Sequence, residues 1–189
     1  MNGLKRGAIG LLGTLLLVAA GASMWFWFTP VGVNNYVNKV TLQLAIDSPE
    51  LLTYLGAIDN TALDFHSGKL ADYTKEKEER SIAKLRNARE GLDDYGPDGL
   101  SGQELLTWKI AAWFFDDQLR QAELRYSGYR VNQISGVTVN MPQFLTDTHV
   151  IKNKKSVRRY LSRLAEFGRV LHETHERVTD DRANGVIPP

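Results

Sequence analysis

The densest group of side chains that could bind a metal ion is the run HETHE, from His172 to Glu176. A zinc peptidase of the zincin type needs the spacing His-Glu-x-x-His, which turns both imidazoles toward one ion and brings the glutamate to the bound water. Here the histidines are three residues apart, and a third ligand from His66 or His149 would require a distant loop to fold back. We therefore expect no metal site, with both histidines flanking a core seam and both glutamates solvated.

No other arrangement predicts catalysis. Paired acids occur at 93–94, 116–117 and 180–181, but adjacent helical residues point about 100° apart, so we interpret them as surface charges. The sequence has neither a glycine-rich phosphate loop after a strand nor a Gly-x-Ser-x-Gly motif. The basic residues of 152–159 form a solvated face, with an acidic phospholipid or a partner protein as the alternative contact; they are Lys152, Lys154, Lys155, Arg158 and Arg159. We therefore predict no catalytic, cofactor-binding or metal-binding residue in this chain.

Composition excludes several further classes. The net charge of +1 provides no field that would attract nucleic acid, so we expect no nucleic-acid partner. The chain has no cysteine, which excludes disulfides, thiolate chemistry and lipid attachment through a cysteine. A domain of about 150 residues buries enough surface for one core.

The N-terminus predicts a membrane segment. Residues 7–38 carry no charge and Ala8 to Phe28 are almost wholly apolar, which meets the length of about 20 residues that a spanning helix needs. Lys5 and Arg6 would keep the N-terminus in the cytoplasm. We expect residues 1–30 to be a membrane anchor, with membrane contact through residues 7–28, and residues 31–189 to be a periplasmic or extracellular domain. A cleavable signal peptide with the site Ala20-Gly21-Ala22 is the alternative.

Capping residues mark the expected helix starts. Ser48 precedes Pro49, Ser101 and Glu104 have capping-box spacing, and Asn153 precedes the last long periodic segment. A further surface helix is expected over Thr74–Leu92, and Gly185 fits the C-terminal end of the last helix. Residues 31–47 are expected to be a helix or an ordered connection.

Apolar spacing completes the fold prediction. The helix after Ser101 carries two apolar stripes, which indicates neighbours on two sides; they are Leu105, Trp108, Ala112, Phe115 and Leu119, and Leu106, Ile110, Trp113 and Phe114. The last helix has one core stripe, formed by Val157, Tyr160, Leu164, Phe167, Leu171, His175 and Val178. Glycine and proline predict an ordered loop near 126–152, with a weak alternative of a β-pair at 137–139. The predicted class is all-α, with about four to six helices after the membrane helix.

A series of segments resembles the bacterial domain-of-unknown-function family 885. They are SPELLTYLG (48–56), VNQISGV (131–137), MPQFL (141–145), YLSRLAEFGRVL (160–171) and RANGVIPP (182–189). Their order and approximate spacing match the family from Ser48 to the last residue.

The resemblance implies a largely helical, exported protein, often lipid-anchored and several times longer. In longer members, a His-Glu-x-x-Pro-Gly-His segment implies a zinc metallopeptidase-like hydrolase, so zinc is expected only there, and HETHE is not that segment. We expect this chain to be the inactive N-terminal scaffold of such a hydrolase at the bacterial inner membrane, spanning it once, with the missing C-terminal half as its partner. The alternative is a self-contained, non-enzymatic periplasmic module that binds a partner protein.

Overall fold

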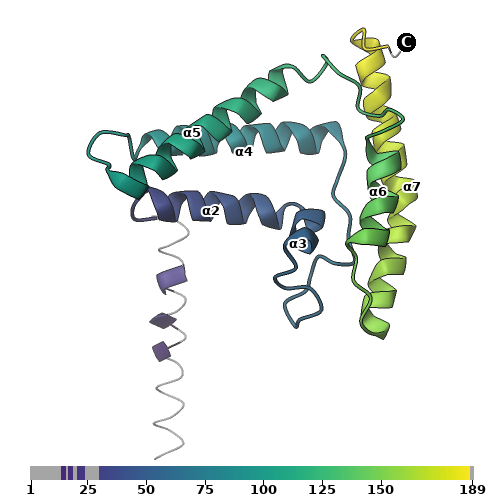
Figure 1. The fold of residues 1–189 in the computed structure, drawn as a ribbon, viewed down its shortest axis with the longest axis horizontal. Coiled ribbons are helices and arrows are strands. Elements are labelled where there is room, and N and C mark those ends of the chain that lie inside the picture. Colours follow the sequence, from purple (N-terminus) through teal and green to yellow (C-terminus); the bar gives the residue numbers. More distant parts are fainter. Residues whose placement is uncertain (1–13, 16, 19–20, 24–29, 188–189) are drawn as a thin grey trace, which may run out of the picture.

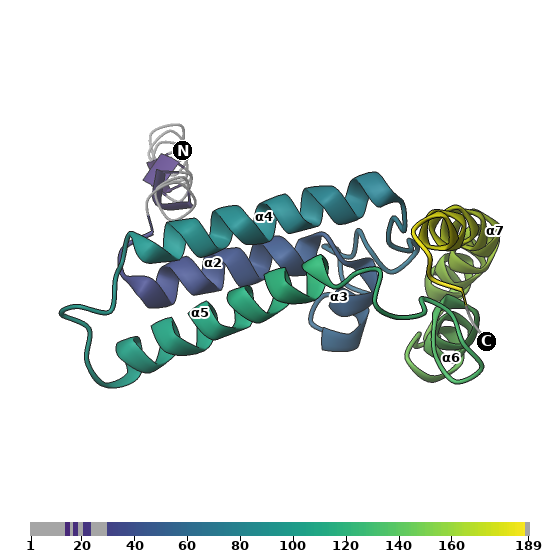
Figure 2. The ribbon, with the colours of Figure 1, turned by 90° about the horizontal axis from the view of Figure 1, so that it is seen from above.

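The computed structural model describes residues 14–15, 17–18, 21–23 and 30–187. Within these ranges the secondary structure is helical, without a strand, so the all-α prediction is confirmed. Three long helices lie side by side, namely α2 (Val33–Ile46), α4 (Lys75–Asp93) and α5 (Gly102–Glu123). A pair formed by α6 (Val137–Asp147) and α7 (Lys154–Ala183) stands across one end of these three (Figures 1 and 2).

The predicted single-pass localisation in a bacterial inner membrane is wrong for the structure as described. No helix among the described residues is long and apolar enough to cross a membrane. Most of Ala8 to Phe28, the segment on which the prediction depended, lies outside the described residues. The N-terminal transmembrane helix and the signal anchor therefore have no structural support.

The first core lies between α2, α4 and α5. Its most deeply buried members are Val33, Leu92 and Phe115. The Tyr36 hydroxyl of α2 donates a hydrogen bond of 2.8 Å to the carbonyl of Ala88 in α4. Burial, followed by the nearby charges of Tyr95 and Asp94, raises the pKa of Tyr36 to about 12. A Cβ on Gly91 would lie 2.4 Å from the Tyr36 hydroxyl oxygen, so glycine at this position allows the two helices to approach.

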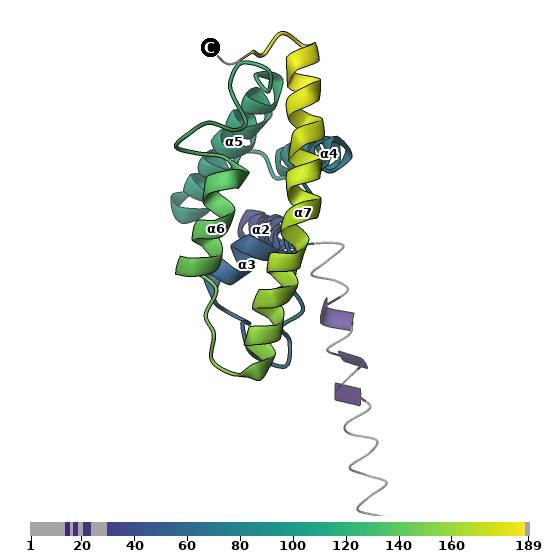
Figure 3. The ribbon, with the colours of Figure 1, turned by 90° about the vertical axis from the view of Figure 1, so that its right-hand side faces the viewer.

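The second core joins α6 to α7. It consists of Leu70, Val137, Met141, Phe144, Leu145 and Val170. Figure 3 shows α6 lying along α7, with the short helix α3 (Pro49–Leu55) beside them. As predicted, Ser48 caps α3, accepting a hydrogen bond from the backbone N–H of Leu51, and Asn153 caps α7. Gly185 follows α7 with a φ of +87°, as expected for its C-terminal end.

Two local predictions are wrong. The segment 126–152 is not a loop throughout, because it contains α6 with Pro142 inside the helix. Glycine and proline argue against a helix locally, but burial of Val137, Met141 and Phe144 outweighs the one backbone bond that proline removes. The Ser101 side chain makes no capping hydrogen bond among the described residues, although α5 does begin at Gly102.

The buried face of α7 also differs from the prediction. Its buried residues are Ser156, Arg163, Val170, Arg177 and Asp181. Tyr160 and Phe167 pack against the second core, but the rest of the predicted stripe lies outside, with Leu164 46% and Leu171 44% exposed. Periodicity therefore predicted the helix correctly but not its buried face, which carries Arg163 and Arg177.

Candidate functional site

The two histidines of HETHE lie on the outer side of α7. His172 and His175 are both exposed, and His172 Nε2 lies 3.5 Å from Glu176 Oε1. Glu173 is not solvated as expected, because it accepts hydrogen bonds from the backbone N–H of Tyr73 and from Arg169. In the described structure these histidines flank no core seam, whereas Glu173 joins α7 to the segment at Tyr73.

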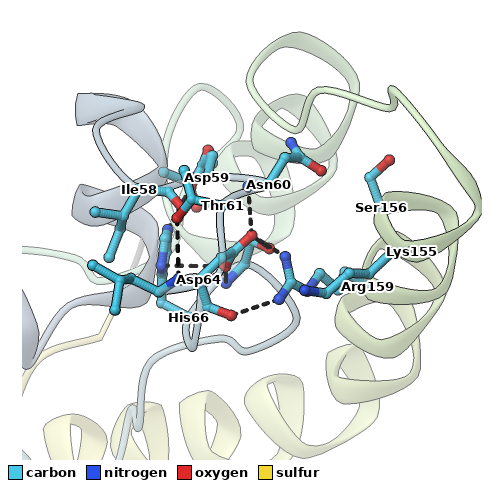
Figure 4. A network of polar contacts seen from close by, with 12 residues as sticks. Ile58, Asp59, Asn60, Thr61, Asp64, His66, Lys155, Ser156 and Arg159 are labelled. Carbon is cyan, nitrogen blue, oxygen red and sulfur yellow. Dashed lines mark hydrogen bonds and ion pairs between the residues drawn. The ribbon is translucent and has the colours of Figure 1, made fainter. Parts of the chain in front are cut away.

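A different histidine lies in a buried polar cluster (Figure 4). His66 is 1% exposed, and its Nε2 lies 2.6 Å from Asp59 Oδ1, while its Nδ1 lies 3.5 Å from Asp64 Oδ1. One potential ligand atom from each of these three side chains falls within 4.8 Å of the others. The loop that carries them does fold back onto α7, which the sequence analysis did not predict. It contacts the helix at Arg159, however, and not at His175 of the HETHE run.

The charges around this cluster favour a structural role. Asp64 accepts from the backbone N–H of Asn60 at 2.7 Å and from the Ser67 hydroxyl at 2.8 Å, and it forms an ion pair with Arg159. Burial alone would raise the pKa of Asp64, but these hydrogen bonds and the Arg159 charge outweigh it and lower the pKa. A metal ion would have to compete with a guanidinium already in contact with the same carboxylate, so we assign the cluster to anchoring the loop on α7.

Arg163 holds the neighbouring elements together. Its side chain is fully buried and donates to the Lys69 carbonyl at 2.9 Å, to Thr53 Oγ1 at 2.7 Å and to His149 Nδ1 at 2.9 Å. Since Nδ1 accepts this bond, His149 is neutral and its Nε2 N–H points to the Ser156 carbonyl, 3.2 Å away. Burial lowers the pKa of Arg163 to about 10, and burial together with the Arg163 charge lowers that of His149.

A pocket of about 460 Å³ lies beside this polar region. Its apolar wall comes from the second core and from α3, and includes Leu70, Val137, Met141, Phe144 and Tyr54. Its polar lining comes from five segments and consists of Glu50, Tyr73, Arg130, Asn140, Thr174 and Arg177. A volume of this size and a mixed lining are typical of small-molecule sites.

The two arginines that line the pocket pair with two acids, Glu78 and Asp181, that do not line it. Arg177 is in contact with Glu78, and Arg130 lies 3.3 Å from Glu78 Oε1 and 2.7 Å from Asp181 Oδ2. Burial alone would raise the pKa of Glu78, but the Arg177 hydrogen bond and both guanidinium charges lower it. Asp181 is 3% exposed, so its expected surface position is wrong.

The segment VNQISGV places Arg130 next to α6. Asn132 Oδ1 accepts hydrogen bonds from the backbone N–H groups of Ile134 and Ser135, which closes a tight turn. Gly136 has a φ of +108°, and a Cβ there would lie 2.7 Å from the Arg130 carbonyl oxygen. Only glycine tolerates both the backbone angle and this approach.

The other charged groups singled out in the sequence have different surroundings. Asp116 pairs with Arg89 on the surface, and Asp180 pairs with Lys75 at 3.0 Å, so each of these acids joins two helices. Arg159 is only 16% exposed and paired, while Lys152, Lys154, Lys155 and Arg158 are exposed, as expected. The pocket was missed because its charged residues come from segments far apart in sequence.

The described residues thus define an all-α protein with a mixed polar and apolar pocket between α3, α6 and α7. A family described as "Bacterial protein of unknown function (DUF885)" matches residues 49–189, and the chain belongs to this family. The resemblance drawn from the five sequence segments is therefore confirmed. Neither the curated proteins nor the solved structures contain a match to the chain.

Proposed function

We propose that this chain is the helical scaffold of a peptidase-like hydrolase of the DUF885 family. Family membership supports the assignment, and the expected chemistry belongs to the His-Glu-x-x-Pro-Gly-His segment that the resemblance places in longer members. The scaffold would form one wall of a cleft, and the partner that completes the cleft would supply the metal ligands.

The single observation that carries the scaffold role is the apolar surface left bare on two helices. On α5, Ile110 is 56% and Trp113 65% exposed, next to Leu106 and Phe114. On α7, Leu161 is 55% exposed and continues a stripe through Leu164 and Leu171. Apolar helix faces of this kind are typical of surfaces that another protein segment covers.

The second candidate is a self-contained module that binds a separate protein, since the same bare faces suit a partner chain. Sequencing the coding DNA beyond the Pro189 codon separates the two candidates. The scaffold role predicts a continuation, in frame or frameshifted, that encodes His-Glu-x-x-Pro-Gly-His. Unrelated sequence after a clean stop codon would favour the self-contained module.

The scaffold role also predicts that the purified chain holds no stoichiometric zinc. The two exposed histidines of HETHE would supply only two protein ligands, whereas catalytic zinc normally has three and structural zinc four. Metal analysis should find well under one zinc per chain, and chelation should leave the helical circular dichroism unchanged. One tightly bound zinc that His175→Ala removes would assign a metal function to HETHE instead.

A further inference from the structure

The pocket between α3, α6 and α7 contains hydrogen-bonding groups that its own residues leave unused. Arg177 is 5% exposed, and its Nε and Nη1 are buried without a hydrogen-bond partner among the described residues. Arg130 Nη2 is likewise buried and has no hydrogen-bond partner within the described part of the chain. Each such buried donor costs free energy until it is paired, so these guanidinium groups are ready to donate to a ligand oxygen.

The start of α6 adds to this donor side. Gly136 and Val137 line the pocket, and the N-terminal end of the helix has no side-chain cap among the described residues. Free backbone N–H groups and the helix dipole favour negative charge at such an end. An arginine with a planar fork of donors suits a carboxylate in particular.

An acceptor lies in the same pocket. Glu50 accepts a hydrogen bond from the Ala71 N–H through Oε1, while Oε2 is buried and has no hydrogen-bond partner within the described residues. Glu50 and Tyr73 line the pocket together, and the Glu50 charge, after burial itself, raises the pKa of Tyr73 to about 12. An unpaired carboxylate oxygen suits an ammonium group.

Charge balance selects a zwitterion over a simple anion. Arg130 and Arg177 already face Glu78 and Asp181, so the donor side carries no net charge. The Glu50 charge is offset by Arg163, which is fully buried and bonds to carbonyls, Thr53 and His149. A ligand with net charge would unbalance these buried groups, whereas one carboxylate and one ammonium would pair both unused sides.

We propose that this pocket binds a small apolar zwitterion of the size of an amino acid or a dipeptide. Its carboxylate contacts Arg177, Arg130 and the start of α6, its ammonium contacts Glu50, and its side chains pack on Val137, Met141 and Phe144. The site goes beyond the proposed scaffold role and does not depend on it, because all of these residues belong to the described chain.

The ligand chemistry is tested by titration calorimetry of the full chain with leucyl-leucine. We expect saturable binding that weakens at least about tenfold for leucyl-leucinamide, which lacks the carboxylate, and for N-acetyl-leucyl-leucine, which lacks the ammonium. Glycyl-glycine and inorganic phosphate should bind more weakly still. Equal binding of the amide, equal binding of phosphate, or no saturable binding of leucyl-leucine at millimolar concentration would overturn the proposal.

The location is tested by two matched substitutions on α6. Asn140 and Thr138 are both exposed, but only Asn140 lines the pocket. Asn140→Trp should fill the mouth and abolish leucyl-leucine binding, while Thr138→Trp should leave it unchanged. Arg177→Lys, which keeps the charge but loses the fork of donors, should weaken binding at least about tenfold with the helical spectrum intact. If both tryptophan variants bind as the parent does, the site is elsewhere.

Discussion

Arg163 shows how much one buried side chain contributes to this architecture. It joins α7 to α3, to the loop at Lys69 and to His149 by hydrogen bonds from a single guanidinium group. Its Cζ also lies 4.8 Å from the ring centroid of Phe144, so the guanidinium spans polar and apolar surroundings. The residue therefore replaces the hydrophobic side chain that the middle of a buried helix face would normally carry.

Removal of Arg163 should destabilise the fold strongly. Arg163→Met would leave the Lys69 carbonyl, Thr53 Oγ1 and His149 Nδ1 without their donor, at about 1 kcal/mol or more each, so we expect a loss of about 2–4 kcal/mol in urea unfolding. The control is Arg158→Met, an exposed arginine on the same helix, which should change stability by less than about 0.5 kcal/mol. Equal unfolding midpoints for the two variants would contradict the role assigned to Arg163.

Glu78 makes part of the stability depend on pH. Its pKa in the folded protein is below its usual value of 4.5, so its ion pairs contribute fully above that value and are lost as the pH falls through the folded pKa. Glu78→Gln should therefore be less stable than the parent at pH 7, and should lose less further stability between pH 5 and pH 3. Glu79→Gln, at the exposed neighbouring position, should retain the acid sensitivity of the parent. A Glu78→Gln variant with the same pH slope as the parent would be the contrary result.

At the scale of elements, Asn153 and Ser101, two of the three predicted capping residues, behave differently for a geometric reason. Asn153 accepts hydrogen bonds from the N–H groups of Lys155 and Ser156, and the Ser156 hydroxyl accepts one from the Asn153 N–H. Gly102 follows Ser101 with a φ of +52°, and with this backbone the Ser101 side chain does not cap α5. The same residue types thus give a cap only where the local backbone allows it.

These two caps provide a matched prediction. Asn153→Ala should lower the free energy of unfolding by about 1 kcal/mol, because α7 loses its N-terminal acceptor. Ser101→Ala should change it by only a few tenths of a kcal/mol, because no capping bond is broken. Thermal or urea unfolding of both variants checks this, and equal losses would show that Ser101 caps α5 in solution.

At the scale of the whole molecule, the bare faces of α5 and α7 predict hydrophobic behaviour in solution. The full chain should bind a hydrophobic dye or self-associate, because contiguous apolar patches beyond a few hundred Å² are uncommon on soluble monomers. The double variant Ile110→Asn/Trp113→Gln should reduce dye fluorescence and association. The control pair Lys109→Gln/Glu123→Gln, at exposed polar positions of the same helix, should have no effect. A dye-negative, monodisperse parent would contradict the exposed apolar faces on which both candidate functions depend.

The sequence by itself determined the helical class, the starts of α3 and α7, and the family, because capping chemistry, periodicity and family motifs are local signals. It did not determine which side of α7 is buried. Leucine periodicity favoured the stripe through Leu164 and Leu171, whereas the fold buries Arg163 and Arg177, whose partners come from segments about 100 residues away. The same limit applies to α6, where burial overrides Pro142, and to the pocket, whose Glu50, Arg130 and Arg177 meet only after α3, the VNQISGV turn and α7 come together. Polar burial of this kind depends on long-range pairing, and only the tertiary structure decided it.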